Sequence, residues 1–162
     1  MSKGLALLSL SLLLASGAAS AAVPPQMASL QFMVGTWNCT TTAGPTTIAE
    51  AETIVAQNPL WLHGSGTITS TGQPVSEDFY VGYDARRSQW VLITIDSNGE
   101  YGIATSVTPN LSPSTWISAY PAMSGMTGTG TFTKVSDRQY TVDFSQTVNN
   151  KVIGSHEVCT KQ

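Results

Sequence analysis

Charged residues and reactive side chains are both scarce in this chain. Its 162 residues include 7 Lys and Arg, 10 Asp and Glu, 2 His and 2 Cys, with a formal net charge of −3. The basic residues are scattered, whereas binding to phosphate backbones needs them in clusters. We therefore expect no nucleic-acid partner. No long run of like charge predicts a solvating tail.

Sequence motifs that carry catalysis or metal binding are also missing. The chain contains no G-x-S-x-G nucleophile motif and no H-E-x-x-H zinc motif. Glu77 and Asp78 are neighbours, so in a strand their side chains would point to opposite faces and form no catalytic pair. His63 and His156 adjoin no recognisable nucleophile. We therefore expect no catalysis, no metal and no cofactor.

The only long apolar run stands at the N-terminus. Lys3 precedes the apolar stretch Leu5 to Ala15, and Ala19-Ser20-Ala21 fits a secretory cleavage site. A membrane-spanning helix needs about 20 apolar residues, and this run is shorter. The sequence predicts a cleaved signal peptide (1–21) and a single mature domain (22–162) without a membrane anchor. We expect the mature protein to be secreted or periplasmic.

Cys39 and Cys159 both lie in the mature chain, near its two ends. In an oxidising compartment an isolated pair of cysteines predicts a disulfide bond. Disulfide geometry holds the two Cα atoms close together. The first and last strands should therefore lie side by side.

Short runs rich in Val, Ile, Thr and aromatic residues, separated by turn residues, predict a strand-rich chain. The candidate strands are 35–41, 46–57, 60–69, 75–83, 89–96, 101–108, 115–120, 128–135, 139–147 and 152–160. Helical spacing occurs only through Gln26 to Val34, after Pro24-Pro25. Asn98-Gly99 favours a type I′ hairpin turn.

The short links between these strands predict sequential antiparallel pairing. A meander of this length would leave two open edges unless it closed, and the cysteines sit where closure would occur. We therefore predict an all-β fold, a closed antiparallel up-and-down barrel of about ten strands, with a short helix after the cleaved signal peptide.

Alternation along the strands assigns faces to some side chains. In the strand 75–83, Glu77 and Phe79 share one face and Tyr80 lies on the other. Glu50 and Glu52 also share a face, which we interpret as solvated and outward. The strand 89–96 is apolar on both sides, so we expect the N-terminal helix or a loop to cover its outer face.

Several motifs, in their order, resemble known barrels. The stretch Leu30 to Trp37, with its Gly-x-Trp ending, is similar to the entry of lipocalin-like, or calycin, barrels. Gly82-Tyr83-Asp84, Trp90-Val91 and Ile95-Asp96-Ser97-x-Gly99 resemble a bacterial lipocalin-like domain family of unknown function, distantly similar to nitrobindins. The resemblance implies a barrel with an internal cavity and no agreed activity.

The resemblance also implies structural roles for five residues: Gly35, Trp37, Gly82, Tyr83 and Asp84. Trp37 would plug the closed end of the barrel. Gly82 would permit a tight bend.

A barrel of this size can leave an interior cavity for one small ligand. The aromatic residues are the candidate lining, and we predict binding of a small, mainly apolar molecule. The predicted ligand-binding residues are Trp61, Phe79, Tyr80, Trp90, Tyr101, Trp116, Tyr120 and Phe144.

Two alternatives remain open. The first alternative is a haem-binding barrel that uses His156 or His63, because nitrobindins hold a b-type haem through a His near the C-terminus. The alternation of side chains along a strand argues against haem binding through His156. If Cys159 faces inward, Glu157 shares that face and His156 points outward, unless a bulge intervenes. The other alternative is a filled barrel that serves as a structural or protein-interaction module. The sequence indicates no particular protein partner.

Overall fold

The computed structural model describes residues 23–69, 72–120, 126–148 and 151–162. The predicted signal peptide (1–21) lies outside the described residues. Ten strands follow a short helix at the N-terminal side of the domain. The strands are β1 Gly35–Ala43, β2 Thr46–Asn58, β3 Trp61–Thr69, β4 Val75–Asp84, β5 Gln89–Asp96, β6 Tyr101–Ser106, β7 Ser114–Tyr120, β8 Met126–Ser136, β9 Gln139–Val148 and β10 Lys151–Lys161.

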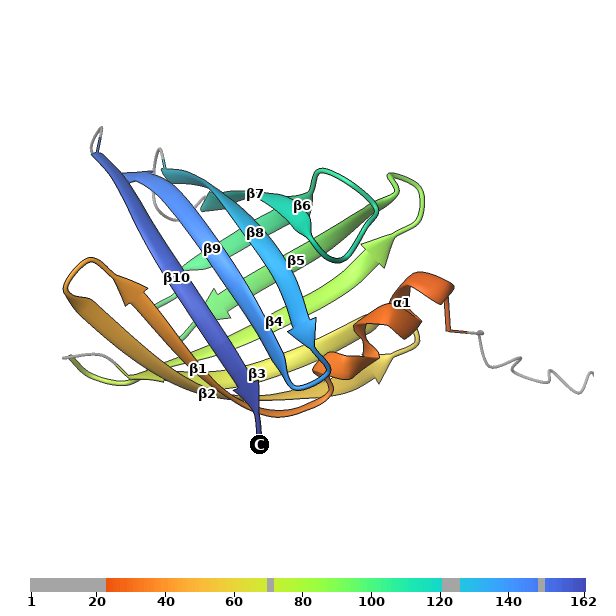
Figure 1. Ribbon diagram of the computed structural model, residues 1–162, viewed down its shortest axis with the longest axis horizontal. Coiled ribbons are helices and arrows are strands. Elements are labelled where there is room, and N and C mark those ends of the chain that lie inside the picture. The colour runs from red at the N-terminus through yellow and green to blue at the C-terminus, as the bar shows by residue number, and fades with distance from the viewer. Residues whose placement is uncertain (1–22, 70–71, 121–125, 149–150) are drawn as a thin grey trace, which may run out of the picture.

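The strands form a closed barrel in which every strand pairs with its sequence neighbours and β1 pairs with β10 (Figure 1). All pairs are antiparallel, so the predicted closed antiparallel barrel is confirmed. Cys39 and Cys159 lie directly opposite each other on β1 and β10, and a disulfide joins them. The predicted bond is therefore present at the seam of the barrel.

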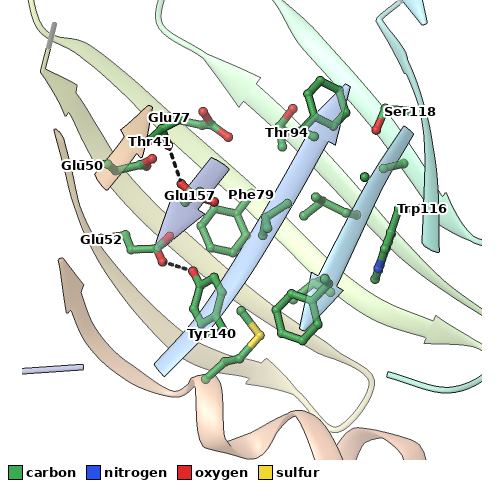
Figure 2. A pocket seen from close by; sticks show the side chains of 18 of the residues that line it. Thr41, Glu50, Glu52, Glu77, Phe79, Thr94, Trp116, Ser118, Tyr140 and Glu157 are labelled. Atoms are coloured by element: carbon green, nitrogen blue, oxygen red, sulfur yellow. Dashed lines mark hydrogen bonds between the residues drawn. The ribbon is translucent and has the colours of Figure 1, made fainter. Parts of the chain in front are cut away.

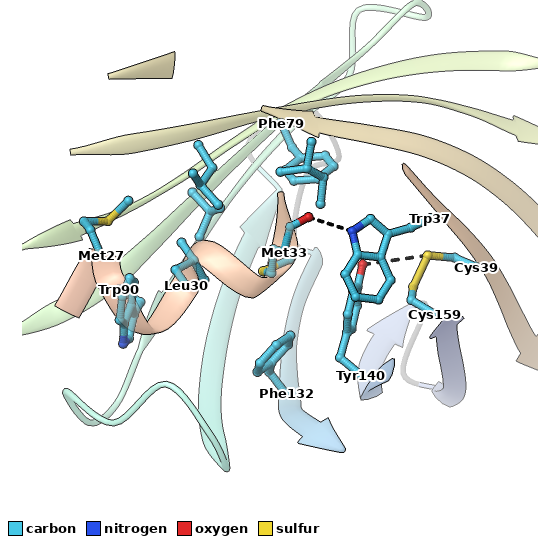
Figure 3. Packing of buried hydrophobic residues seen from close by; sticks show 13 residues of the cluster. Met27, Leu30, Met33, Trp37, Cys39, Phe79, Trp90, Phe132, Tyr140 and Cys159 are labelled. Atoms are coloured by element: carbon cyan, nitrogen blue, oxygen red, sulfur yellow. Dashed lines mark hydrogen bonds between the residues drawn. A yellow bond between two sulfur atoms is a disulfide. The ribbon is translucent and has the colours of Figure 1, made fainter. Parts of the chain in front are cut away.

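One end of the barrel is closed by the helix α1 (Pro25–Leu30) and the single 3₁₀ turn η1 (Gln31–Met33). Met27, Leu30 and Met33 are buried against inward side chains of the strands (Figure 3). The indole Nε1 of Trp37, at the start of β1, donates a hydrogen bond to the carbonyl of Met33 at 2.6 Å. Trp37 is fully buried and packs at this closed end.

The helix does not cover the outer face of β5, contrary to the sequence-based expectation. It caps the barrel instead, because its apolar side chains belong to the core cluster at the closed end. Ile95 on the outer face of β5 therefore stays 48% exposed. No helix in the described part of the chain is long and apolar enough to cross a membrane.

The turn between β5 and β6 also differs from the prediction. A type I′ turn needs positive φ at both central residues. Gly99 has φ +84°, but Asn98 is not in the positive region. The Asp96 carboxylate instead accepts hydrogen bonds from the backbone N–H groups of Asn98 (2.8 Å) and Glu100 (3.0 Å). The acidic side chain organises this turn.

Two glycines of the lipocalin-like motifs stand where other backbone or side-chain atoms approach closely. Gly35 has φ +139°, and a Cβ there would lie 2.6 Å from Cε of Lys161. A Cβ on Gly82 would lie 2.6 Å from the Trp61 ring and from the carbonyl oxygen of Leu60. Strand β4 continues through Gly82, so this glycine permits close packing of β3 on β4 rather than the expected bend.

Tyr83 and Asp84 occupy the end of β4. The Tyr83 ring meets Trp90 edge-on, with ring centroids 5.0 Å apart. The Asp84 carboxylate accepts hydrogen bonds from the backbone N–H groups of Arg86 and Arg87 and pairs with the Arg87 guanidinium at 3.0 Å. Asp84 thus fixes the turn that leads into β5.

Candidate functional site

The barrel holds a partly open cavity of about 350 Å³ beside the closed end. Side chains from nine of the ten strands line it, together with Leu30, Met33 and Leu111. Strand β3 presents glycine instead. A Cβ on Gly64 would overlap the Phe79 ring, and one on Gly66 would lie 2.6 Å from a Glu50 oxygen. The glycines of β3 therefore leave the room that Phe79 and Glu50 occupy.

One side of the cavity is apolar. We call it the apolar wall; it consists of Leu92, Ala104, Trp116, Phe132, Val142 and Phe144. The indole N–H of Trp116 donates to the Ser114 hydroxyl at 2.7 Å, and that hydroxyl donates to the carbonyl of Leu111 at 2.6 Å. The polar atom of Trp116 is therefore already satisfied, and its ring can offer apolar contact to the cavity.

The other side carries four carboxyl groups, shown at the left and centre of Figure 2. We call it the acidic wall; it consists of Glu50 and Glu52 on β2, Glu77 on β4 and Glu157 on β10. The expectation that Glu50 and Glu52 point into solvent is wrong. They lie opposite Cys39 and Trp37 of β1, both of which face inward, and residues directly opposite in an antiparallel pair share a face.

Sequence reasoning missed these two glutamates although a usable indication exists. Only Gly44 and Pro45 separate β1 from β2. So short a hairpin fixes the register, which places Cys39 opposite Glu50. The inward direction expected for the cysteine therefore determines that of Glu50.

Glu52 lies deepest in the acidic wall and is only 5% exposed. The Tyr140 hydroxyl donates a 2.6 Å hydrogen bond to its Oε1 (Figure 2). Burial raises the pKa of Glu52 to about 8, although the Tyr140 hydrogen bond acts in the opposite direction. Burial also holds the pKa of Tyr140 well above its usual value. The pair is satisfied within the protein.

Glu157 also has an internal partner, because the Thr41 hydroxyl donates to its Oε1 at 3.1 Å. Its pKa is raised by burial, against the effect of that hydrogen bond. Glu50 and Glu77 differ: within the described residues neither carboxyl has a hydrogen bond or an ion pair. Burial, and then the charges of neighbouring carboxylates, raise the pKa of each to about 7. Both groups are therefore partly protonated near neutral pH.

Three of the predicted ligand-binding residues, Phe79, Trp116 and Phe144, line the cavity. Trp90 is buried at the closed end, where its indole Nε1 donates to the carbonyl of Pro109 at 3.1 Å. The side chain of Tyr120 lies outside the described residues.

The structure corrects the placement of Trp61, Tyr80 and Tyr101, which lie on the outer face of the barrel. Each follows or precedes an inward residue, and adjacent side chains of a strand point to opposite faces. Tyr80 follows Phe79 and stacks outside on His63, with ring centroids 4.7 Å apart. The prediction rested on the aromatic character of these residues alone. It did not take into account that side chains alternate between the two faces of a strand.

Both histidines also lie on the outer face. Nε2 of His63 is 2.8 Å from Oδ1 of Asp78, and Nδ1 of His156 is 2.7 Å from Oδ1 of Asp143. The parity argument that pointed His156 outward and Glu157 inward agrees with this arrangement. Among the described lining residues there is thus no His that could reach a haem iron in the cavity.

The acidic wall does not have the spacing of a metal centre. Across the described residues, one group brings three ligand atoms close enough to hold an ion: Cys39, Cys159 and Glu157. Both of its sulfurs are joined in the disulfide, so neither is a thiolate ligand. The glutamates of the cavity are spread along its wall rather than gathered around one point.

No protein-family model matches the chain, and no curated protein matches it either. Several solved structures do. Rv2717c from M. tuberculosis is 12% identical, covering 86% of this chain and 99% of that one, with a TM-score of 0.64. The S-type phycobiliprotein lyase CPES from Guillardia theta is 8% identical, covering 84% and 92%, with a TM-score of 0.57.

A de novo designed fluorescence-activating β-barrel is 15% identical and covers 82% of this chain and 95% of its own, with a TM-score of 0.50. The likeness is in the fold. At such low identities these structures agree with a β-barrel and leave the particular lipocalin-like family as a prediction.

Proposed function

We propose that this protein is an exported binding protein that holds a small, mainly apolar molecule inside its barrel, without catalysis. The observation that carries the proposal is the cavity of about 350 Å³ with its apolar wall. Ligand pockets of about 300–1,000 Å³ are typical for small molecules, and they are mostly apolar with a few placed polar groups. An interior of this kind argues against the filled-barrel alternative.

Two further features support export. The N-terminal run, from Lys3 to Ala21, has the pattern of a secretory signal peptide. The Cys39–Cys159 disulfide suits an oxidising compartment, where such bonds form and persist. The barrel, its short N-terminal helix and the Gly35-x-Trp37 entry also support membership of the lipocalin-like family that the sequence resembles.

The proposal can be tested by native mass spectrometry of the protein purified from its own host. The Ala104→Leu variant narrows the cavity at the apolar wall, whereas Ala51→Leu adds the same atoms to an exposed outer position. We expect the wild type and Ala51→Leu to carry one small molecule, and Ala104→Leu to carry little or none.

Calorimetry with octan-1-ol, a neutral apolar probe, provides a second measurement. Its affinity should fall at least tenfold in Ala104→Leu and stay unchanged in Ala51→Leu. Binding of octan-1-ol that responds equally to both variants would place the ligand outside the cavity and refute the proposal. So would a protein that carries no ligand and takes up no probe.

A further inference from the structure

The acidic wall faces the cavity without a cation. Its carboxyl groups come from β2, β4 and β10, and the described lining residues include no Lys, Arg or His. Taking a carboxylate out of water is costly unless an opposite charge or hydrogen-bond donors compensate it. Glu52 and Glu157 have such donors in Tyr140 and Thr41. The remaining two have no such donor among the described residues, so when they ionise, their compensation has to come from the contents of the cavity.

Those two are Glu50 and Glu77. Both line the cavity, and Figure 2 shows their carboxyl groups together with that of Glu157 on the same side of it. Each is repelled by neighbouring carboxylates: Glu50 by Glu157, and Glu77 by Glu50 and Glu157. Asp96, opposite Glu77 on β5, adds to this repulsion. A positive charge placed here would interact favourably with all of these groups.

A separate observation on the opposite side of the cavity also points to a ligand. Ser118 on β7 is only 6% exposed and lines the cavity. Its hydroxyl has no hydrogen-bond partner among the described residues, and none of their buried side-chain N or O atoms lacks one, so this hydroxyl oxygen must be open to the cavity. Figure 2 shows Ser118 across the cavity from the acidic wall. This hydroxyl is available to a polar group of a molecule in the cavity.

The spacing of the carboxyl groups distinguishes between kinds of cation. Within the described part of the chain, no group of three glutamates brings its oxygens close enough to hold a metal ion. An organic cation is larger, and its charge can interact with carboxylates that stand apart. Its apolar part would contact the apolar wall, where the Trp116 and Phe144 rings can also attract positive charge.

We propose that the cavity selects organic cations: molecules with a protonated amine or quaternary ammonium group held by Glu50 and Glu77, and an apolar body against the apolar wall. This inference rests on the proposed binding function and names the class of ligand. The protein discriminates by charge as well as by apolar contact. Neutral apolar molecules bind more weakly, and carboxylates most weakly of all.

The experiment compares three probes with the same chain by isothermal titration calorimetry at pH 8, below micelle formation: octyltrimethylammonium, octan-1-ol and octanoate. We expect the cation to bind the wild type at least tenfold more tightly than the alcohol, and octanoate to bind more weakly than the alcohol. This comparison needs no variant, so it stands even where a substitution impairs folding.

The variant Glu50→Gln/Glu77→Gln keeps the shape of both side chains and removes their charge. It should reduce the preference for the cation to less than threefold while leaving the affinity for octan-1-ol unchanged. The control Glu100→Gln/Asp137→Asn changes the net charge equally, at the β5–β6 turn and at an exposed residue beyond β8. It should keep the preference.

The outcomes separate the two proposals. If octan-1-ol binds in the cavity and the cation binds no more tightly, the inference is overturned and the proposed function stands. Equal loss of preference in both double variants would also overturn it, because the effect would then come from overall charge. If none of the probes binds, the proposed function fails as well.

Discussion

At the scale of single residues, Glu52 shows burial and hydrogen bonding acting on one carboxyl group in opposite directions. Burial raises its pKa, and the Tyr140 hydroxyl lowers it. The hydroxyl also lies 3.7 Å from the sulfur of Cys39, so the pair sits directly beneath the disulfide. The core around the seam of the barrel therefore depends on a polar contact as well as on apolar packing.

Replacement of Tyr140 with Phe removes the donor and leaves a buried carboxyl oxygen without a partner. We expect the free energy of unfolding to fall by about 1–3 kcal/mol, the usual cost of an unsatisfied buried group. Urea denaturation at pH 7 measures it. Tyr80→Phe is the matched control on the outer face, and it should change stability by less than about 0.5 kcal/mol. Equal effects of the two substitutions would show that the contact contributes nothing specific.

At the scale of elements, β1 and β10 complete the barrel, and the disulfide links them across a sequence separation of 120 residues. In the chain-entropy account, a cross-link closing so long a loop stabilises the folded state by about 4–5 kcal/mol, an upper figure. We expect Cys39→Ala/Cys159→Ala to lose about 3–5 kcal/mol in urea denaturation.

Reducing agent serves as the control for this prediction. It should lower the stability of the wild type and leave the double variant unchanged. If the reduced wild type and the variant are both as stable as the oxidised protein, the hydrogen bonds between β1 and β10 close the barrel without help from the disulfide.

The strands themselves could be predicted closely from the sequence. All ten expected strands are present, each with bounds within two residues of those observed, because β-branched runs and turn residues mark them locally. Closure followed from one long-range constraint, the cysteine pair. The turn at Asn98 could not be predicted in the same way, because the Asp96 side chain competes there for the backbone N–H groups.

The faces of the strands were harder to predict than their bounds. Along β2, glutamates alternate with small residues, and the usual expectation puts the charged face outside. The structure has Glu52 inside and Ala51 exposed, because the register with β1 decides the face and local polarity does not. Where a barrel contains a cavity rather than a packed core, the type of a residue is a weak indication of whether its side chain points inward or outward.

At the scale of the whole molecule, polarity is partly inverted. Carboxyl groups line the interior, while the outer faces of β5, β6 and β7 carry exposed apolar side chains, among them Ile95, Ile103 and Ile117 at 42–55% exposure. The apolar exterior does not stabilise the fold by burial, and the buried carboxyl groups oppose folding whenever they ionise. The stability of the ligand-free protein should therefore depend on pH.

The sign of this dependence follows from the pKa values. Those of Glu50 and Glu77 rise from 4.5 to about 7, and that of Glu52 to about 8, so between these limits the folded protein holds more protons than the unfolded chain. Unfolding then releases protons, and stability falls as the pH rises. Stabilisation is fully present below about pH 4.5 and is lost progressively up to about pH 8.

We expect the melting temperature of ligand-free protein to be higher at pH 5 than at pH 8, with a difference on the order of a few kcal/mol in the free energy of unfolding. The two Gln side chains of Glu50→Gln/Glu77→Gln are neutral at every pH, so this variant should have a less steep profile, with the remaining slope due to Glu52, and should be more stable than the wild type at pH 8. Glu100→Gln/Asp137→Asn should keep the wild-type slope. A melting temperature that rises from pH 5 to pH 8 would mean that these carboxyl groups ionise in the barrel without cost, and the electrostatic reason for an organic cation would then disappear.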